Sequence, residues 1–365
     1  MKIIIRKNIL YIYIILFFII SYLSINNVDK YLSSSIHSKQ LFWYIIGLLL
    51  ILLIKRINIK KIYNLSILLY IINNLLLIGL FFFGTRINNT ISWYRIQNIT
   101  IQPSEFMKIN LILLNSYIIY RFYKNKEKIK TKKEAKMILL LLFVLFIPSI
   151  ITFFQPDTGA VIGYTIITIS MLYISGIDKK WLYLLFIITL VIIIAFSITY
   201  LINKEILINI FGRSIIYRIE RIINWRHKSG LQLNNSLIAI GSSGLVGHNK
   251  IPIYYPEAST DFIFTSYASS YGLIGIILFF LLTISFDSYL IKIMKHENNY
   301  ENKYTLFGIL SLFFYQQIQS ISMTLGLLPI NGITLPLISY GGSSILSYLI
   351  LIGIVQNIRS KQKKL

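Results

Sequence analysis

The chain has 365 residues, of which 56% are apolar and 13% charged, with 36 lysines and arginines against 13 aspartates and glutamates. Soluble domains carry about 25% charged and 45–50% apolar residues, so this composition excludes a water-soluble enzyme and a disordered chain. The absence of cysteine excludes a disulfide-stapled domain, while the formal net charge of +23 fits either nucleic-acid binding or the cytoplasmic loops of a membrane protein.

Ten segments of the chain are apolar enough to be transmembrane helices. A helix needs about 20 mostly apolar residues to cross about 30 Å of hydrocarbon, and these segments, one of them short and one long, come near that length. In chain order they span residues 9–25, 41–54, 62–83, 101–120, 138–154, 160–177, 181–202, 262–290, 305–325 and 335–358. The sequence therefore predicts an all-α integral membrane protein, polytopic with about ten transmembrane helices, in a single domain over residues 1–365.

The distribution of basic residues predicts the orientation of these helices. If the N-terminus is cytoplasmic, 24 of the 36 lysines and arginines fall in cytoplasmic segments, whereas the short outer loops hold only Lys30, Lys39, Arg86 and Arg95. Cytoplasmic loops of membrane proteins carry such an excess, so both termini are predicted to be cytoplasmic. The densest basic run, residues 124–133, then lies in a cytoplasmic loop, and no nucleic acid is expected as a partner.

The connection between the seventh and eighth predicted helices is much longer than the others. It covers residues 203–261 and is predicted to be a large extracytoplasmic loop. Loops of this length are usually functional or disordered. This one is not of low complexity, since it contains a glycine-rich run at 240–245 and the string Tyr-Pro-Glu-Ala-Ser-Thr-Asp-Phe at 255–262.

Polar residues gather at the predicted outer ends of four helices. Glu105, Asp157 and Asp261 stand at or near the starts of the fourth, sixth and eighth helices, and a Ser-Tyr-Gly-Gly string at 339–342 belongs to the start of the tenth. An acid in the first turn is an ordinary helix N-terminal signal. A structural role and a functional role therefore both stay open for Glu105 and Asp157.

Lys108 lies inside the fourth predicted helix, where an ammonium group is costly and usually faces a partner or a wet cavity. Glu105 is three residues away on the same helix face. The two residues are therefore predicted either to form a structural ion pair or to belong to a site. No cluster of histidines or cysteines in the sequence suggests a metal site.

Four strings of residues occur in the same order as in the SEDS family (shape, elongation, division and sporulation proteins), which the chain resembles over nearly its whole length. They are Ile-Gln-Pro-Ser-Glu-Phe-Met-Lys at 101–108, Gln-Pro-Asp-Thr-Gly at 155–159, Pro-Glu-Ala-Ser-Thr-Asp-Phe-Ile-Phe at 256–264, and Gly-Leu-Leu-Pro followed by Leu-Pro-Leu-Ile-Ser-Tyr-Gly-Gly-Ser within 326–343. The resemblance implies a glycosyltransferase of the bacterial cytoplasmic (inner) membrane that polymerises lipid II, the peptidoglycan precursor, on the outer side. The compact length and the segment 236–244 favour the elongation branch, RodA, over the division branch, FtsW.

The resemblance also implies partners and residue roles. The expected partners are a class B penicillin-binding protein, acting as transpeptidase, and membrane proteins of the elongation complex, and the cofactor it suggests is a divalent cation, Mg²⁺ or Mn²⁺. The acid of the Thr-Asp-Phe string, Asp261, is the implied catalytic residue, and a carboxylate base suits the attack of a sugar hydroxyl on a glycosyl donor. The leaving pyrophosphate requires cationic groups. The expected substrate-binding residues are Glu105, Lys108, Asp157, Glu257, Trp93, Arg95, Ser339 and Gly341.

The sequence departs from the family pattern just after the Asp261 string. Family members commonly have a pair of glutamates where this chain has Ser269 and Ser270. Three other functions stay open: an FtsW-like polymerase for division, a lipid II flippase or transporter, and a non-catalytic scaffold of the elongation machinery. The intramembrane Glu105 and Lys108 motivate the flippase, and the missing glutamate pair motivates the scaffold.

Overall fold

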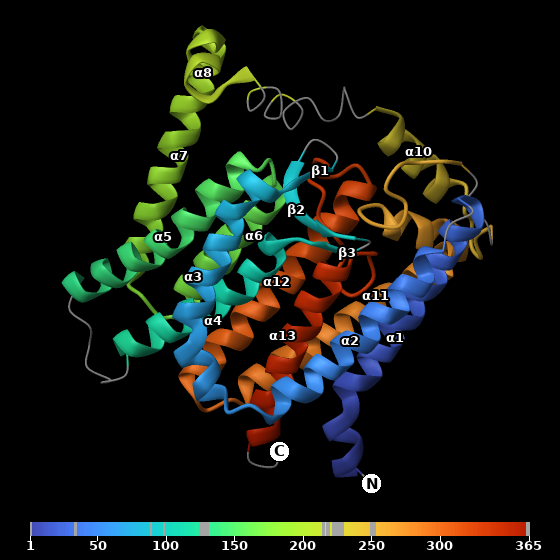
Figure 1. The fold of residues 1–365 in the computed structure, drawn as a ribbon, viewed down its shortest axis with the longest axis horizontal. Coiled ribbons are helices and arrows are strands. Elements are labelled where there is room, and N and C mark those ends of the chain that lie inside the picture. The colour runs from blue at the N-terminus through green and yellow to red at the C-terminus, as the bar shows by residue number, and fades with distance from the viewer. Residues whose placement is uncertain are drawn as a thin grey trace.

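The computed structural model describes residues 2–32, 35–87, 90–97, 99–123, 131–213, 216, 220, 230–248 and 253–362. This part of the chain is mainly helical (Figure 1). Its long helices are α1 (Lys2–Leu32), α2 (Ile36–Arg56), α3 (Ile59–Phe83), α4 (Pro103–Tyr123), α5 (Thr131–Phe154), α6 (Thr158–Ile174), α7 (Lys179–Ile202), α11 (Ile263–Lys295), α12 (Tyr300–Thr324) and α13 (Gly342–Lys361). The shorter elements are α8 (Lys204–Phe211), α10 (Gly230–Gly241), β1 (Thr85–Ile87), β2 (Thr90–Ile96) and β3 (Ile99–Ile101).

Every apolar segment predicted from the sequence overlaps one long helix of the described chain. Among the described residues, seven helices are long and apolar enough to cross a membrane, namely α1, α2, α3, α5, α7, α11 and α13. Helix α6 has only 17 residues, and α4 and α12 are more polar. Most residues of α4 and α12 are buried, so their polar side chains face protein instead of lipid. A polytopic helical membrane protein is confirmed, whereas the total of ten spans stays a prediction.

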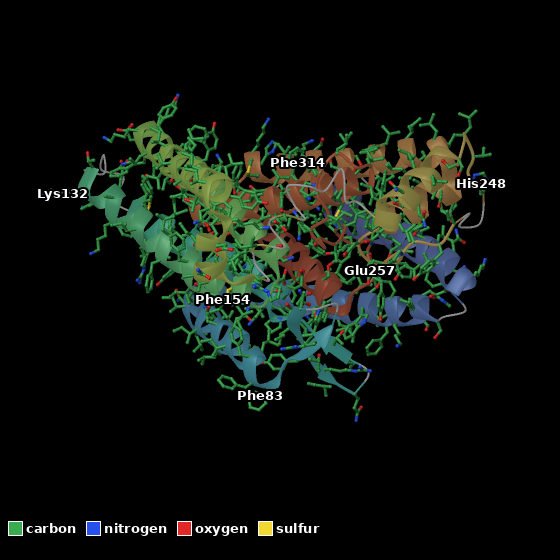
Figure 2. All side chains as sticks on the ribbon, turned by 90° about the horizontal axis from the view of Figure 1, so that it is seen from above. Phe83, Lys132, Phe154, His248, Glu257 and Phe314 are labelled. Atoms are coloured by element: carbon green, nitrogen blue, oxygen red, sulfur yellow. The ribbon has the colours of Figure 1, made fainter. Side chains whose placement is uncertain are left out.

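The two chain ends lie at one end of the helix bundle, and the sheet, α8 and α10 lie toward the other end (Figure 1). This arrangement agrees with the prediction that both termini are on the same side. Helix α7 has no buried residues and stands with α8 at the edge of the bundle (Figure 1). Large side chains on the bundle surface, such as Phe83, Phe154 and Phe314, are more than half exposed (Figure 2), as expected where a helix contacts lipid.

A small antiparallel sheet in the connection between α3 and α4 was not predicted. The strand order is β1-β2-β3, and Tyr94 on β2 lies opposite Ile101 on β3. The Tyr94 hydroxyl donates to the Leu76 carbonyl at 2.7 Å, which attaches the sheet to α3. Residues 99–101 therefore belong to a strand, and α4 begins at Pro103 because proline suits the first position of a helix.

The tenth predicted segment starts too early. Residues 335–341 form an irregular loop, and α13 begins at Gly342. Pro336 has no N–H to donate, and Leu337 has a left-handed φ of 65°, which a right-handed helix does not contain. The apolar character of this loop comes from burial inside the protein and not from contact with lipid.

Helices α2 and α13 pack closely because small residues lie between them. A Cβ on Gly47 of α2 would overlap a side chain of α13, and a Cβ on Gly342 would overlap the ring of Trp43. Small residues let helix backbones approach closely inside membranes. Gln40, Tyr44 and Gly47 are buried at helical spacing, so one face of α2 is directed toward α13 and the loop that precedes it.

Helix α11 is interrupted at Gly272, whose φ of 61° and ψ of −160° are not helical. Segment 243–248 of the long outer connection fills the interruption, and the Leu273 N–H donates to the Gly244 carbonyl at 3.0 Å. Such bonds satisfy backbone groups that an interrupted helix leaves without a partner. The outer connection is therefore built into α11.

The two serines at the positions where the resemblance leads us to expect a glutamate pair lie at this interruption. Ser269 and Ser270 have no exposed surface, and the His248 N–H donates to the Ser269 carbonyl at 3.0 Å. The departure from the family pattern thus lies inside the junction between α11 and the outer connection.

We expect Gly247→Ala to destabilise the protein by about 1–3 kcal/mol more than Gly244→Ala. Both glycines have a left-handed φ, 80° and 59°, so alanine strains both backbones. A Cβ at position 247 would also overlap the backbone of Ser270, whereas nothing lies within 4 Å of a Cβ at position 244. Thermal unfolding in detergent micelles measures the difference, and equal losses in the two variants would contradict this packing argument.

Candidate functional site

Asp261 occupies a tight turn directly before α11. The N–H groups of Thr260 and Phe262 both donate to the Glu257 carbonyl, at 3.2 and 3.0 Å, and the Thr260 hydroxyl donates to the Glu257 carboxylate at 2.6 Å. Phe262 is fully buried. The turn is therefore held on both sides of Asp261.

The environment of Asp261 favours its protonated form. The side chain lies in a half-buried position, and burial raises the pKa of the carboxyl to about 7, with smaller contributions from the negative charges of Glu257 and Asp157. Burial disfavours a charged carboxylate, and like charges nearby do the same. Asp157 comes from the start of α6, so the fold gathers three of the predicted acidic residues at the N-terminal ends of α6 and α11.

The loop of residues 326–341 covers Asp261. A Cβ on Gly332 would lie 3.5 Å from Asp261 Oδ2. The buried Ser339 hydroxyl donates to the Thr260 carbonyl at 2.6 Å and accepts a backbone N–H of its own loop at 2.8 Å. Ser339 thus binds the loop to the Asp261 turn, and its predicted contact with substrate stays a prediction.

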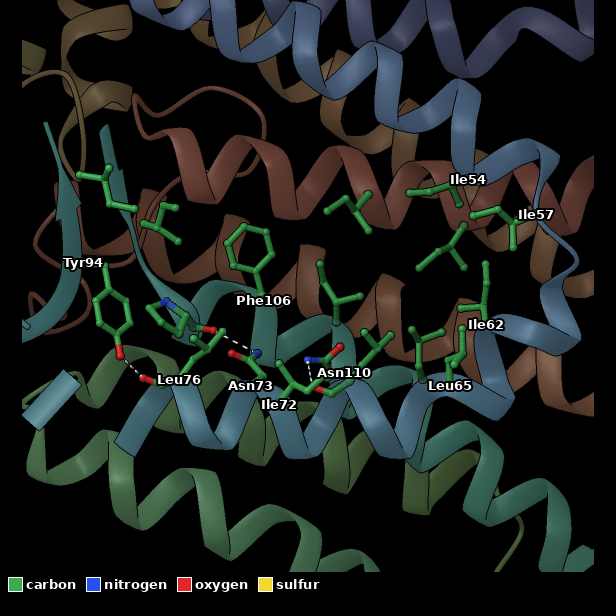
Figure 3. A pocket seen from close by; sticks show the side chains of 18 residues that line it. Ile54, Ile57, Ile62, Leu65, Ile72, Asn73, Leu76, Tyr94, Phe106 and Asn110 are labelled. Atoms are coloured by element: carbon green, nitrogen blue, oxygen red, sulfur yellow. Dashed lines mark hydrogen bonds between the residues drawn. The ribbon is translucent and has the colours of Figure 1, made fainter. Parts of the chain in front are cut away.

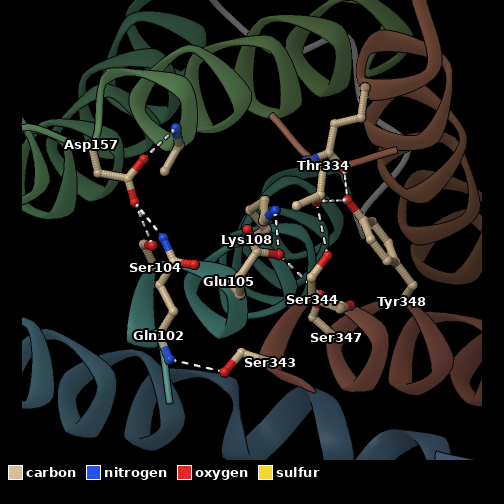
Figure 4. Close-up of polar contacts among 12 residues, drawn as sticks. Gln102, Ser104, Glu105, Lys108, Asp157, Thr334, Ser343, Ser344, Ser347 and Tyr348 are labelled. Atoms are coloured by element: carbon tan, nitrogen blue, oxygen red, sulfur yellow. Dashed lines mark hydrogen bonds and ion pairs between the residues drawn. The ribbon is translucent and has the colours of Figure 1, made fainter. Parts of the chain in front are cut away.

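Asp157 joins α4 to α6 (Figure 4). Its Oδ1 accepts the Ala160 N–H at 3.2 Å, which caps α6. Its Oδ2 accepts from Gln102 Nε2 and from the Ser104 hydroxyl, both at 2.8 Å. The helix-capping role left open by the sequence is present, and Asp157 also ties the starts of two helices together.

Lys108 and Glu105 form an ion pair, one of the two alternatives that the sequence left open, with 2.6 Å between Nζ and Oε2 (Figure 4). Lys108 is only 2% exposed. Glu105 Oε2 also accepts from the Ser347 hydroxyl at 3.3 Å, and Lys108 Nζ is 5.6 Å from the ring centroid of Tyr348. The pair therefore lies buried between α4 and α13.

In the described chain, the contacts of Trp93, Arg95 and Gly341 do not involve the acidic residues or Lys108. Trp93 pairs with Thr85 in the sheet, and the exposed Arg95 donates from Nε to the Gln97 carbonyl at 3.3 Å. Gly341 is the residue before α13 and has an extended backbone. No hydrogen bond or ion pair between described residues joins these three to Asp261, and their role in substrate binding stays a prediction.

Several polar residues of the site were not singled out from the sequence. The hydroxyl of Thr334 contacts that of Ser344 at 2.8 Å, and the Tyr348 hydroxyl donates to Gln316 Oε1 at 2.8 Å. Hydroxyl and amide side chains recurring at helical spacing within apolar spans are the signal that could have found them. The residues missed in this way are Gln316, Thr334, Ser347 and Tyr348. Four others were part of the polar strings at the starts of the fourth and tenth predicted helices, although no role was predicted for them: Gln102, Ser104, Ser343 and Ser344.

The described residues do not present a metal site, since no three His, Cys, Asp or Glu side chains among them are grouped to hold an ion. The negative charges of Glu257 and Asp157 raise the pKa of Asp261, but the three acids do not form such a group. The divalent cation that the resemblance suggests therefore has no assigned ligands, and no reaction step is derived through it.

An apolar groove of about 740 Å³ runs beside the polar groups, between α3, α4 and α13 (Figure 3). It extends from Ile54 at the end of α2 to Ile101 on the sheet. The amide nitrogens of Asn73 and Asn110 donate to the Pro103 and Leu69 carbonyls, each at 3.3 Å, whereas Asn73 Oδ1 is buried without a hydrogen-bond partner among the described residues. Almost all of the other side chains that line the groove are apolar. The groove is therefore suited to an aliphatic chain.

A model of the FtsW/RodA/SpoVE family of cell cycle proteins matches residues 1–364. The chain belongs to this family. The SEDS resemblance is thereby confirmed, and with the apolar helices it makes the chain a multi-pass protein of the bacterial cytoplasmic membrane.

The relatives of this SEDS protein come from both branches of the family. A probable peptidoglycan glycosyltransferase FtsW of Coxiella burnetii is 32% identical, covering 88% of this chain and 85% of the relative. The peptidoglycan glycosyltransferase MrdB of Helicobacter pylori is 31% identical, with 95% and 88% covered, and the peptidoglycan glycosyltransferase RodA of Treponema pallidum is 26% identical, with 92% of both covered.

Solved structures share the fold. A chain of a peptidoglycan synthase complex that coordinates polymerization and crosslinking has a TM-score of 0.77 at 19% identity, covering 97% of this SEDS protein and 98% of that chain. The rod shape determining protein RodA of Thermus thermophilus has a TM-score of 0.66 at 19% identity, with 97% of both covered.

Proposed function

We propose that this SEDS protein, a peptidoglycan glycosyltransferase, polymerises lipid II on the outer side of the cytoplasmic membrane with Asp261 as its general base. The position of Asp261 carries the proposal: it is a half-buried acid in a well-held turn at the outer end of α11, with a pKa of about 7. A general base works best when its pKa lies near the operating pH.

The proposed reaction joins the 4-hydroxyl of an acceptor GlcNAc to the anomeric carbon of a donor MurNAc. The Asp261 carboxylate takes the hydroxyl proton as the new glycosidic bond forms, and the bond to the undecaprenyl pyrophosphate breaks, with the pyrophosphate leaving as an anion. Glu257 and Asp157 make Asp261 more basic through their charge. This role does not require either of them to touch the sugar.

We assign the Glu105–Lys108 pair to holding α4 against α13, because Lys108 is buried and its charge is compensated. Of the two basic residues predicted to bind substrate, Lys108 and Arg95, only the exposed Arg95 on β2 remains free to bind the pyrophosphate on the outer side in this proposal.

We propose that the apolar groove holds the polyprenyl chain of lipid II. Its lining is almost entirely aliphatic and aromatic, and it follows α3 and α4 along their length. Its outer end at Ile101 and Pro103 adjoins Gln102, whose side chain binds Asp157. A lipid in the groove would therefore present its head group beside the acidic residues.

Polymerisation of labelled lipid II by the purified protein, together with a class B penicillin-binding protein, tests the proposal. Glycan strands on a gel are the expected product. Translocation of lipid II across proteoliposomes without strands would favour the flippase, and partner binding without either activity would favour the scaffold.

We further propose the RodA-like role in elongation, on the basis of segment 236–244. Expression in rod-shaped bacteria depleted of their own RodA is expected to restore the rod shape. Restored division in cells depleted of FtsW, without restored shape, would assign the protein to the division branch instead.

The rate of polymerisation is expected to rise with pH and to level off above about pH 7. Because the Asp261 pKa is about 7, the carboxylate fraction at pH 6 is about one tenth, and kcat/KM should be about tenfold below its plateau. Steady-state kinetics between pH 5.5 and 8.5 measure the rate effect, and a flat profile would contradict the role of Asp261.

The raised pKa of Asp261 also affects the free energy of unfolding. It stabilises the folded protein at low pH, and this contribution is lost as the pH rises through about 7.

A further inference from the structure

Three buried side chains of the first two helices hold three successive carbonyl groups of the loop that covers Asp261. Tyr44 donates from its hydroxyl to Leu337 O, and Ser21 donates to Ile338 O at 2.7 Å. Gln40 donates from Nε2 to the next carbonyl, that of Ser339, at 3.2 Å, and to the Ser21 hydroxyl at 2.9 Å. Residues 21, 40 and 44 are almost completely buried.

The carbonyl groups held in this way belong to a strained backbone. Leu337 has a φ of 65°, a conformation that a side chain with a Cβ disfavours. Such a conformation persists only where surrounding contacts determine it. The bonds from α1 and α2 supply those contacts.

The same loop holds the turn that carries Asp261. The Tyr340 N–H donates to the Ser259 carbonyl at 2.8 Å, and the Ser339 hydroxyl donates to the Thr260 carbonyl at 2.6 Å. A continuous set of hydrogen bonds therefore leads from α1 and α2, through residues 337–340, to the residue beside Asp261.

The hairpin of α1 and α2 is itself firmly placed. The His37 N–H donates to Asp29 Oδ2 at 2.7 Å across the hairpin. Trp43 packs so closely on Gly342 that a Cβ there would overlap its ring. Ser21, Gln40 and Tyr44 therefore belong to a helix pair whose own contacts hold it against the loop.

Gln40 carries a buried oxygen that packing alone does not explain. Its Oε1 is buried with no hydrogen-bond partner among the described residues, and an unpartnered buried polar atom weakens the folded state. An apolar residue would avoid this loss but could not hold the Ser339 carbonyl.

We propose that Ser21, Gln40 and Tyr44 are positioning residues that fix Asp261 for catalysis through the loop of residues 337–340. The inference rests on the proposed function for its kinetic consequence, while the mechanical link to the Asp261 turn stands independently. None of the three touches Asp261 itself.

Tyr44→Phe tests the proposal because it removes only the hydroxyl that holds Leu337. We expect kcat to fall about three- to tenfold with KM unchanged, which is the scale of one lost hydrogen bond, and the acidic limb of the pH–rate profile to move to lower pH as water reaches Asp261. Hydrogen exchange of peptides covering 257–264 and 335–341 should become faster. The double variant Tyr44→Phe/Gln40→Met should enlarge all three effects.

Tyr70→Phe is the matched control, because the Tyr70 hydroxyl also donates to a backbone carbonyl, that of Val144 at 2.9 Å, away from the loop. It should change neither the pH–rate profile nor exchange in the two peptides. Equal changes in Tyr44→Phe and Tyr70→Phe, or unchanged exchange in the double variant, would overturn the proposal. If Asp261→Asn kept full activity, the base assignment would fail, and hydrogen exchange would still decide whether the three residues hold the turn.

Discussion

Asp261→Asn is expected to lower the rate of lipid II polymerisation by about 100- to 10,000-fold, the range that a general base contributes. Asparagine has nearly the same shape and cannot accept the proton of the acceptor hydroxyl. The fold should remain intact, because a pKa of about 7 means that burial already disfavours the charged form. A gel assay of glycan strands from labelled lipid II measures the rate.

Asp178→Asn is the matched control for this experiment. Asp178 is half exposed, precedes α7, and has Lys180 as its ion-pair partner at 2.8 Å, so the rate should equal that of the unmodified protein. A folded Asp261→Asn variant that polymerises lipid II at the full rate would show that another group is the base.

Lys108→Met is expected to destabilise the protein by about 3–5 kcal/mol, because it leaves the buried Glu105 carboxylate without its cation. The double variant Glu105→Gln/Lys108→Met should recover most of this loss, since it removes both charges. Unfolding by heat and by denaturant in detergent micelles measures the three proteins. The recovery separates the loss of an ion pair from the loss of the long lysine side chain.

The exposed pair of Asp178 and Lys180 provides the comparison, with side chains that are 51% and 54% exposed. Lys180→Met should leave the unfolding midpoint unchanged, since water screens such a pair. If Lys108→Met were as stable as Lys180→Met, the pair would have no structural role, and Lys108 would become the leading candidate to bind pyrophosphate.

Local patterns in the sequence predicted the parts of this protein that depend on local physics. Each of the ten apolar segments overlaps a long helix of the described chain. The three-residue spacing of Glu105 and Lys108 left an ion pair as one of two predicted alternatives, and the structure contains this ion pair. Both follow from helix periodicity and the cost of polar groups in lipid.

The rest depends on contacts between distant residues, which spacing does not encode. Nothing in the sequence alone places Asp157 near Asp261. Nor does the sequence show that the Ser339 hydroxyl donates to the Thr260 carbonyl. The sequence predicts a helix for residues 335–341 because they are apolar. In the structure they are buried inside the protein, as part of the loop that covers Asp261. Hydropathy reports that a segment avoids water and does not distinguish lipid from protein as its surroundings.

The hydrogen bonds between the first hairpin and the loop of residues 337–340 impose an order on assembly. Ser21 and Ile338 are 317 positions apart in the chain, and Gln40 and Ser339 are 299 apart. Contacts of such separation form late, after the intervening chain has been made and inserted. The turn that carries Asp261 therefore reaches its final form only after residues 337–340 have been synthesised, so a chain that ends before this loop has no complete catalytic centre.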